Sequence, residues 1–89
     1  MPKDDYEKMK AKEILSLVEQ YISSSDKKPI AEKLNKISGD VYYKNKDKVS
    51  QEMIDLSLAI NSFTQAALSG GRFQDFEEFA DDLREIIEG

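Results

Sequence analysis

Apolar residues recur every three or four positions along this chain, and that spacing constrains its fold more than any other feature. The first case lies in residues 4–24. There the apolar residues share one helical face: Ile14, Leu17, Val18, Tyr21 and Ile22. Side chains at these separations lie on one side of an α-helix, whereas a strand would alternate in twos. The spacing therefore predicts a helix over residues 4–24.

A second helix is predicted to begin near Pro29, after the polar run 23–26. Proline suits a first helical turn because the N–H that it lacks would be unpaired there. One face of this helix carries Ile30, Leu34 and Ile37. Gly39 favours a left-handed stop, although Val41 would extend the same face if the helix tolerated the glycine. Residues 40–48 combine β-like and turn-like propensities, so we predict mostly loop there.

A third helix has a clear beginning at Ser50. The Ser50 hydroxyl can accept a hydrogen bond from the backbone N–H of Glu52 or Met53. Val49 and Ile54 flank it at the spacing of a hydrophobic staple. These signals together predict an N-capped helix that starts directly after Ser50.

This third helix should reach Leu68 and end at the glycines of residues 69–71. Apolar residues lie around most of its circumference: Met53, Ile54, Leu56, Leu58, Ile60, Phe63 and Leu68. A helix that is apolar on most sides is buried on most sides. We therefore expect it to be the central helix of the fold, in preference to a partner groove or a dimer seam.

A fourth helix follows, capped by Asp75 and Glu78. Its apolar face consists of Phe76, Phe79, Ala80, Leu83, Ile86 and Ile87. Four helices joined by short connections pack as antiparallel neighbours. The 89 residues are too few for a second domain. The sequence thus predicts one all-α domain over residues 1–89, an antiparallel up-and-down four-helix bundle.

The chain contains neither histidine nor cysteine. This removes the usual general base near neutral pH, the common nucleophile–base pairs and the common zinc ligands. The last helix does place four acids at helical spacing: Asp75, Glu78, Asp82 and Glu85. They could chelate a hard cation, but an acidic face opposite an apolar one is what any surface helix shows. We expect no enzymatic activity, no cofactor and no metal site.

Charge is unevenly distributed. The net charge is −5 overall, whereas residues 27–48 carry seven lysines and three acids, a net +4. The overall balance argues against generic binding to nucleic acid. Residues 29–44 loosely match a helix-turn-helix, but the continuation through 44–48 is a poor helix former and lacks the arginine or glutamine of base readers. We expect a protein partner instead.

The compartment is predicted to be the cytoplasm. Residues 1–6 lead into a charged helix rather than the apolar core of a signal peptide. The longest uncharged stretch, residues 56–71, is too short and too polar to span a bilayer. A secreted scaffold of this size would also normally contain disulfides.

The candidate interaction residues lie in the connection before the third helix: Tyr42, Tyr43, Lys44, Lys46 and Lys48. Adjacent tyrosines cannot both point into one small core, so one should be exposed. Exposed tyrosine is an anchor residue of interfaces, and the lysines would steer an acidic partner or an anionic membrane surface. The alternative is that one ring packs under the connection and the lysines are merely solvated.

Five short segments, taken in order, carry a resemblance to a known family: 11–15 (AKEIL), 23–26 (SSSD), 71–73 (GRF), 76–78 (FEE) and 83–86 (LREI). In this pattern the chain resembles the cytosolic immunity proteins of pediocin-like bacteriocins. The resemblance implies a four-helix bundle that protects a producer cell by stoichiometric binding, at a complex of bacteriocin and sugar-transport receptor on the inner membrane face. It implies no catalytic residues. The alternative is a small regulatory adaptor or phage-type accessory protein that binds another protein or, on weaker grounds, DNA through residues 27–48.

Overall fold

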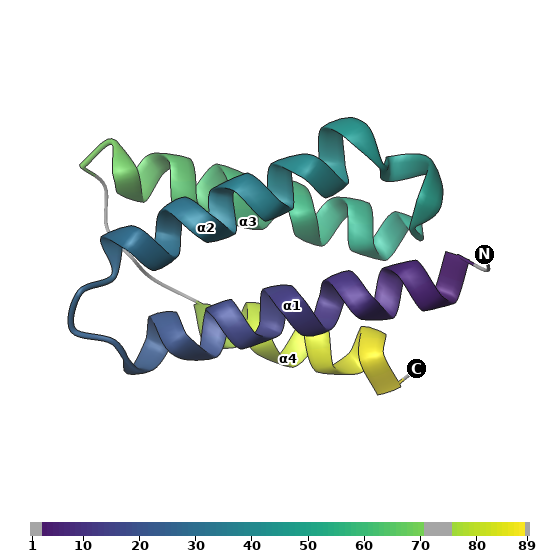
Figure 1. Cartoon of the computed structure of the whole chain (residues 1–89), viewed down its shortest axis with the longest axis horizontal. Helices are drawn as coiled ribbons and strands as arrows, with labels where there is room; N and C mark the ends of the chain where they lie inside the picture. Colours follow the sequence, from purple (N-terminus) through teal and green to yellow (C-terminus); the bar gives the residue numbers. More distant parts are fainter. Residues whose placement is uncertain (1–2, 71–75, 89) are drawn as a thin grey trace.

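The computed structural model describes residues 3–70 and 76–88. Four α-helices make up most of this part of the chain: α1 (Lys3–Ser23), α2 (Lys28–Gly39), α3 (Gln51–Leu68) and α4 (Phe76–Glu88). Successive helices run in opposite directions (Figure 1). The described residues contain no strand. The predicted fold class, an all-α antiparallel up-and-down four-helix bundle, is therefore confirmed.

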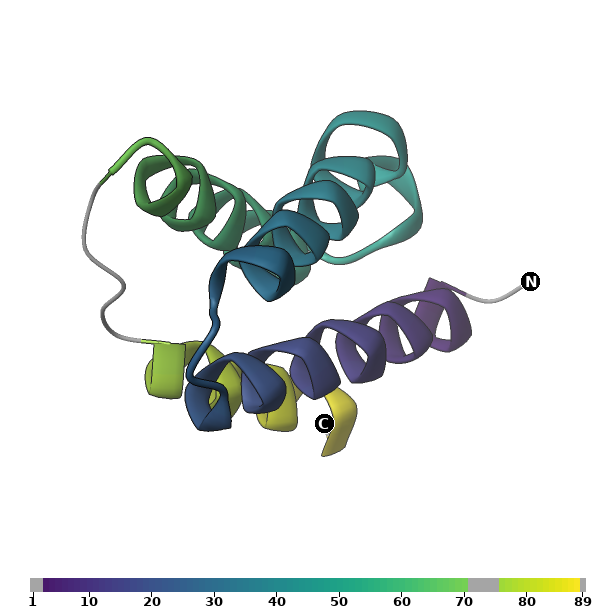
Figure 2. The ribbon, with the colours of Figure 1, turned by 60° about the vertical axis from the view of Figure 1, so that its left-hand side comes forward.

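The helices form two layers. α1 packs along α4, α2 packs along α3, and the layers meet mainly where α1 contacts α2. Figure 2 shows the α1–α4 layer below the α2–α3 layer. α3 and α4 approach each other at few positions, so one side of the bundle is less tightly closed than the other three.

The core collects apolar side chains from every helix. Those with no exposed surface include Ile14, Leu34, Met53, Ile60 and Leu83. Full burial of such a side chain stabilises the fold by about 1.5–3 kcal/mol. The face predicted for α1 is confirmed at Ile14, Val18 and Tyr21, whereas Ile22, at its end, is 40% exposed.

Gly39 is the last residue of α2, but the left-handed stop predicted there was wrong. Its backbone is right-handed and helical, with φ of −62°. A Cβ at this position would lie 3.2 Å from Nδ2 of Asn61 in α3. The glycine therefore permits close approach of two helices. Val41 is fully buried, as the alternative of a continuing helix required.

The prediction of a mostly irregular connection at residues 40–48 was also wrong. Asp40–Lys44 form a π-helical segment that continues α2, and Lys46–Lys48 form a 3-10 turn. Asn45 ends the wide turn by donating its side-chain Nδ2–H to the carbonyl of Asp40 at 3.1 Å. Because no turn separates this segment from α2, residues 29–44 do not have helix-turn-helix geometry.

The N-terminus of α3 is capped as predicted. Ser50 accepts a hydrogen bond from the backbone N–H of Met53 at 3.4 Å, and Val49 before it is buried. Glu7 of α1 adds a contact that the sequence did not suggest. Its carboxylate accepts hydrogen bonds from both the backbone N–H (2.9 Å) and the hydroxyl of Ser50. The start of α3 is thereby tied to α1.

α3 is not the central helix of the bundle. Its buried face consists of Met53, Leu56, Ser57, Ile60, Thr64 and Ala67. Leu58 and Phe63 are 38% and 39% exposed, because α3 packs closely against α2 alone. The helix ends at Leu68, as the sequence predicted, and Gly70 after it is left-handed, with φ of 99°. Asp75, predicted as the cap of α4, lies outside the described residues.

Candidate functional site

The predicted interaction residues lie in the π-helical segment and the turn after it. The side chain of Tyr43 is 68% exposed, whereas Tyr42 is half-buried. Their rings stand edge-on with centroids 4.8 Å apart. One of the two adjacent tyrosines is thus exposed, as the sequence argument required. Val41, buried beside them, holds this part of the segment against the core.

Two of the three lysines contact groups inside the same segment. The Nζ of Lys44 lies 3.5 Å from a carboxylate oxygen of Asp40, one helical turn earlier. The Nζ of Lys46 lies 5.8 Å from the centre of the Tyr42 ring. Both contacts are at the surface, where each contributes at most about 1 kcal/mol. These weak contacts favour the observed positions of the two ammonium groups, but either group can contact a partner instead.

Lys48 points elsewhere, because its Nζ lies over the ring of Tyr6 in α1, 5.6 Å from the centroid. The structure therefore brings together four of the five predicted residues and turns the fifth toward α1. A depression of about 400 Å³ adjoins Tyr43. It is lined by Asn35, Lys36, Gly39, Asp40, Tyr43, Lys44, Asn61 and Gln65. We refer to Tyr43 with this depression as the tyrosine surface.

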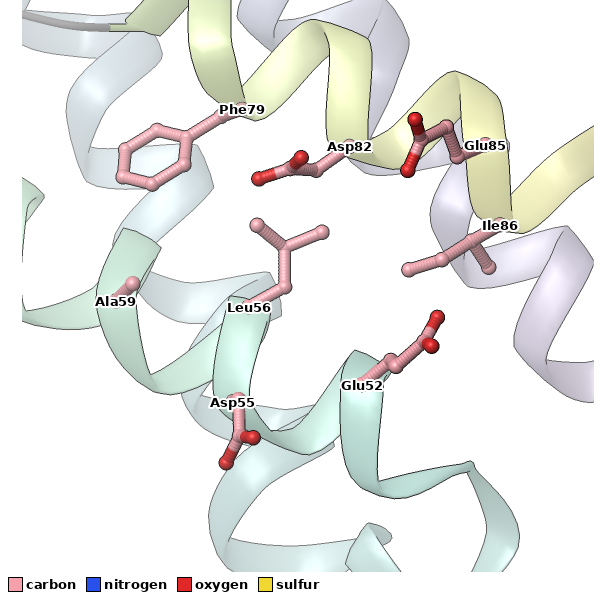
Figure 3. A pocket seen from close by; sticks show the side chains of 8 residues that line it. All are labelled: Glu52, Asp55, Leu56, Ala59, Phe79, Asp82, Glu85 and Ile86. Atoms are coloured by element: carbon pink, nitrogen blue, oxygen red, sulfur yellow. The ribbon is translucent and has the colours of Figure 1, made fainter.

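A second surface feature, which the sequence did not predict, is a groove of about 380 Å³ between α3 and α4 (Figure 3). We call it the acidic groove. Its lining consists of Glu52, Asp55, Leu56, Ala59, Phe79, Asp82, Glu85 and Ile86. Phe79 lies opposite Ala59, and Ile86 lies opposite Glu52 (Figure 3). The two helices therefore run antiparallel along its walls.

The floor of the acidic groove is apolar. Leu56 and Phe79 are each 7% exposed, while Ala59 and Ile86 are half-buried. The ring of Phe63 stands edge-on to that of Phe79, with centroids 5.4 Å apart, and is 39% exposed. Phe63 thus extends the apolar floor by one helical turn beyond Ala59.

The rim of the groove is negatively charged. The carboxylates of Glu52, Asp82 and Glu85 face the open space, whereas Asp55 points away from it (Figure 3) and accepts a hydrogen bond from Gln51 at 2.9 Å. None of the eight lining residues is basic. Among the side chains that the structure describes, none forms an ion pair with any of these four acids. Repulsion between like charges on facing helices opposes closure of this seam.

The nearby cation of α4 is turned to the other side of that helix. Arg84 contacts the carboxylates of Glu19 in α1 at 3.5 Å and of Asp81 at 3.1 Å. In the sequence, Asp82 and Glu85 read as part of a solvated face, and that interpretation missed the groove. The sequence signal for the groove was the presence of acids beside the apolar faces of two helices. It was insufficient because the sequence does not show which helices pack next to each other.

No three acidic side chains of the described residues lie close enough together to hold a metal ion. The helices that the structure describes include none that is long and apolar enough to cross a membrane. Comparisons of the chain with protein-family models, with curated proteins and with solved structures found no match.

Proposed function

We propose that this chain is a non-catalytic cytoplasmic protein that acts by stoichiometric binding to a protein partner, and that the tyrosine surface is a contact site. The observation that carries the proposal is the 68% exposure of Tyr43 on a helical segment that the buried Val41 holds against the core. Exposing a large aromatic ring on an ordered surface favours association, because the ring loses little conformational entropy when a partner covers it.

Within this class we propose an immunity-type role, like that of the pediocin-like bacteriocin immunity proteins that the chain resembles. Its size and its helical bundle support this role, as does the pattern of residues 11–15 and 83–86. The target would be a complex between a bacteriocin and its membrane receptor, at the inner membrane face. The exposed ring beside Lys44 and Lys46 suits a contact near an anionic surface.

Expression in a bacteriocin-sensitive bacterium, followed by challenge with a panel of pediocin-like peptides, tests the immunity role. We expect protection against at least one peptide, and we expect Tyr43→Ala to reduce it. Tyr42→Phe, which changes only the hydroxyl of the neighbouring ring, is the matched control. Unchanged killing across the panel, with the protein present at normal levels in the cells, would refute the immunity role.

The alternative is a small regulatory adaptor or phage-type accessory protein that uses the same surface. The net +4 of residues 27–48 favours an acidic protein partner over a neutral one. A DNA partner predicts an affinity that falls steeply with salt, whereas a partly apolar protein interface is less sensitive. A gel shift with mixed duplexes at low salt separates these branches, since a DNA-binding protein would retard the duplex.

A further inference from the structure

The acidic groove lies between α3 and α4, whereas the depression beside Tyr43 lies between α2 with its π-helical continuation and α3. The groove attracts cations and the tyrosine surface attracts anions, so the two should bind different ligands. The groove, with Phe63 at its end, runs from Glu52 to Phe63 along α3, and a helix rises about 1.5 Å per residue, so the groove is about 16 Å long. That length matches three turns of a partner helix. An apolar floor between two negative rims matches a helix with one apolar face flanked by cations.

We propose that the acidic groove is a docking site for a cationic amphipathic helix of another protein. Leucine-like side chains of that helix would cover Ala59, Phe63 and Ile86, whose surfaces are only partly buried. Lysines or arginines one turn apart would meet Glu52 on one wall and Asp82 or Glu85 on the other. Because these carboxylates have no cation of their own within the described residues, a partner would supply the missing counter-charge.

A second copy of this chain is a poorer occupant. A second copy carries the same net charge of −5, which opposes its approach, and it would have to bind through its basic region, residues 27–48. Its exposed apolar group is the single ring of Tyr43, whereas the groove requires a row of apolar side chains. The charge and the shape of the groove both favour a separate protein.

The test uses the full chain and a synthetic helical peptide that has leucine on one face and lysine on the other. A peptide with glutamate in place of every lysine is the ligand control. Binding is followed by fluorescence anisotropy at low and at physiological salt. We expect the lysine peptide to bind with an affinity that weakens as salt rises, and we expect the glutamate peptide not to bind.

Two pairs of variants locate the binding site. Glu52→Gln with Asp82→Asn should weaken the lysine peptide roughly 3- to 30-fold, because two solvent-accessible ion pairs are lost. The matched control, Glu32→Gln with Glu77→Gln, removes the same charge from exposed positions outside the groove and should leave binding unchanged.

Phe63→Ala should weaken binding about 5- to 30-fold as an apolar anchor is removed. Leu58→Ala, equally exposed on another face of α3, should not.

Three results would overturn the proposal. In the first, the lysine peptide fails to bind the wild-type chain at low salt. In the second, both charge-removal pairs weaken binding equally, which would show general attraction to an acidic protein. In the third, sedimentation shows self-association of the wild type that Phe63→Ala abolishes, which would make a second copy the occupant. Tyr43→Ala should leave peptide binding intact, so this test and the test of the tyrosine surface can fail separately.

Discussion

Asn35 of α2 and Asn61 of α3 exchange hydrogen bonds between their side chains and each other's backbone. The Nδ2–H of Asn35 donates to the carbonyl of Asn61 at 3.2 Å, and the Nδ2–H of Asn61 donates to the carbonyl of Asn35 at 3.0 Å. Asn35 also donates to the hydroxyl of Thr64 at 3.0 Å. The two helices are thus joined by a polar clamp beside Gly39, whose missing side chain makes room for the Asn61 amide.

The clamp and the glycine should be energetically coupled. Gly39→Ala gains about 1 kcal/mol of helix propensity, but its new Cβ would press on the Asn61 amide and displace it from the Asn35 carbonyl. We expect Gly39→Ala to stabilise an Asn61→Ala background more than it stabilises the wild type, with a coupling of about 0.5 kcal/mol or more. Urea unfolding of the two single variants and the double variant measures this. Additive changes in the free energy of unfolding would show that the Asn61 amide moves aside at no energetic cost.

The contact between Glu7 and Ser50 should be worth more than a surface ion pair. Glu7 is nearly buried, and its carboxylate receives two hydrogen bonds at the positive end of α3. Glu7→Ala should lower the free energy of unfolding by about 1–3 kcal/mol, because the donors of Ser50 lose their partner. Glu13→Ala is the control on the same helix, where an exposed pair with Lys10 contributes less than about 1 kcal/mol. Equal losses in the two variants would contradict this account.

Residue types and their spacing predicted α1, the capped start of α3 and its end at Leu68, because these features depend on neighbours within a few residues. The role of Gly39 could not be read in the same way. A glycine after a helix favours a left-handed stop, whereas this glycine lies where a Cβ would come within 3.2 Å of Nδ2 of Asn61, in a different helix. That contact between helices has no signature in the sequence around the glycine.

The two candidate surfaces also differ in how far the local sequence could predict them. Because the tyrosines at 42 and 43 are adjacent, the sequence predicted that one of them is exposed. It did not predict which one. The acidic groove depends on α4 packing along α1 while α3 packs along α2, which leaves the α3–α4 seam open. The distribution of apolar residues around α3 predicted burial on most sides, whereas Leu58 and Phe63 are 38% and 39% exposed.

Stability should fall at high pH because of Tyr21. Burial raises the pKa of the Tyr21 phenol from 10.0 to about 12. The unfolded chain therefore loses this proton near pH 10 while the folded chain retains it. The stabilisation from the protonated phenol, roughly 2–3 kcal/mol of the free energy of unfolding, is fully present below pH 10. It is lost as the pH rises through about 12.

Tyr21→Phe isolates this effect, since phenylalanine keeps the ring that lies under the Nζ of Lys27 at 4.7 Å. We expect the free energy of unfolding to decline less steeply between pH 10 and pH 12 in the variant than in the wild type. The comparison uses the slopes of unfolding free energy against pH and not the absolute stabilities, because the substitution also removes a buried hydroxyl. Parallel slopes would mean that the phenol ionises at its ordinary pKa.

The tyrosine surface leads to a prediction in which binding and stability separate. The Tyr43 ring is 68% exposed and contacts the Tyr42 ring by its edge, so its truncation leaves no cavity in the core. Tyr43→Ala should weaken partner binding by about 1–3 kcal/mol, because truncation of an exposed anchor costs affinity and not packing. The melting temperature should stay close to that of the wild type.

Val41→Ala provides the opposite case within the same segment. Val41 is fully buried, so the substitution should lower the free energy of unfolding by about 1–3 kcal/mol while leaving the Tyr43 ring in place. At a temperature where both variants remain folded, only Tyr43→Ala should lose partner affinity. Calorimetric titration of each variant against the same partner measures this difference. If Tyr43→Ala instead lowers the melting temperature by several degrees with its affinity unchanged, the ring serves the fold and the partner binds elsewhere.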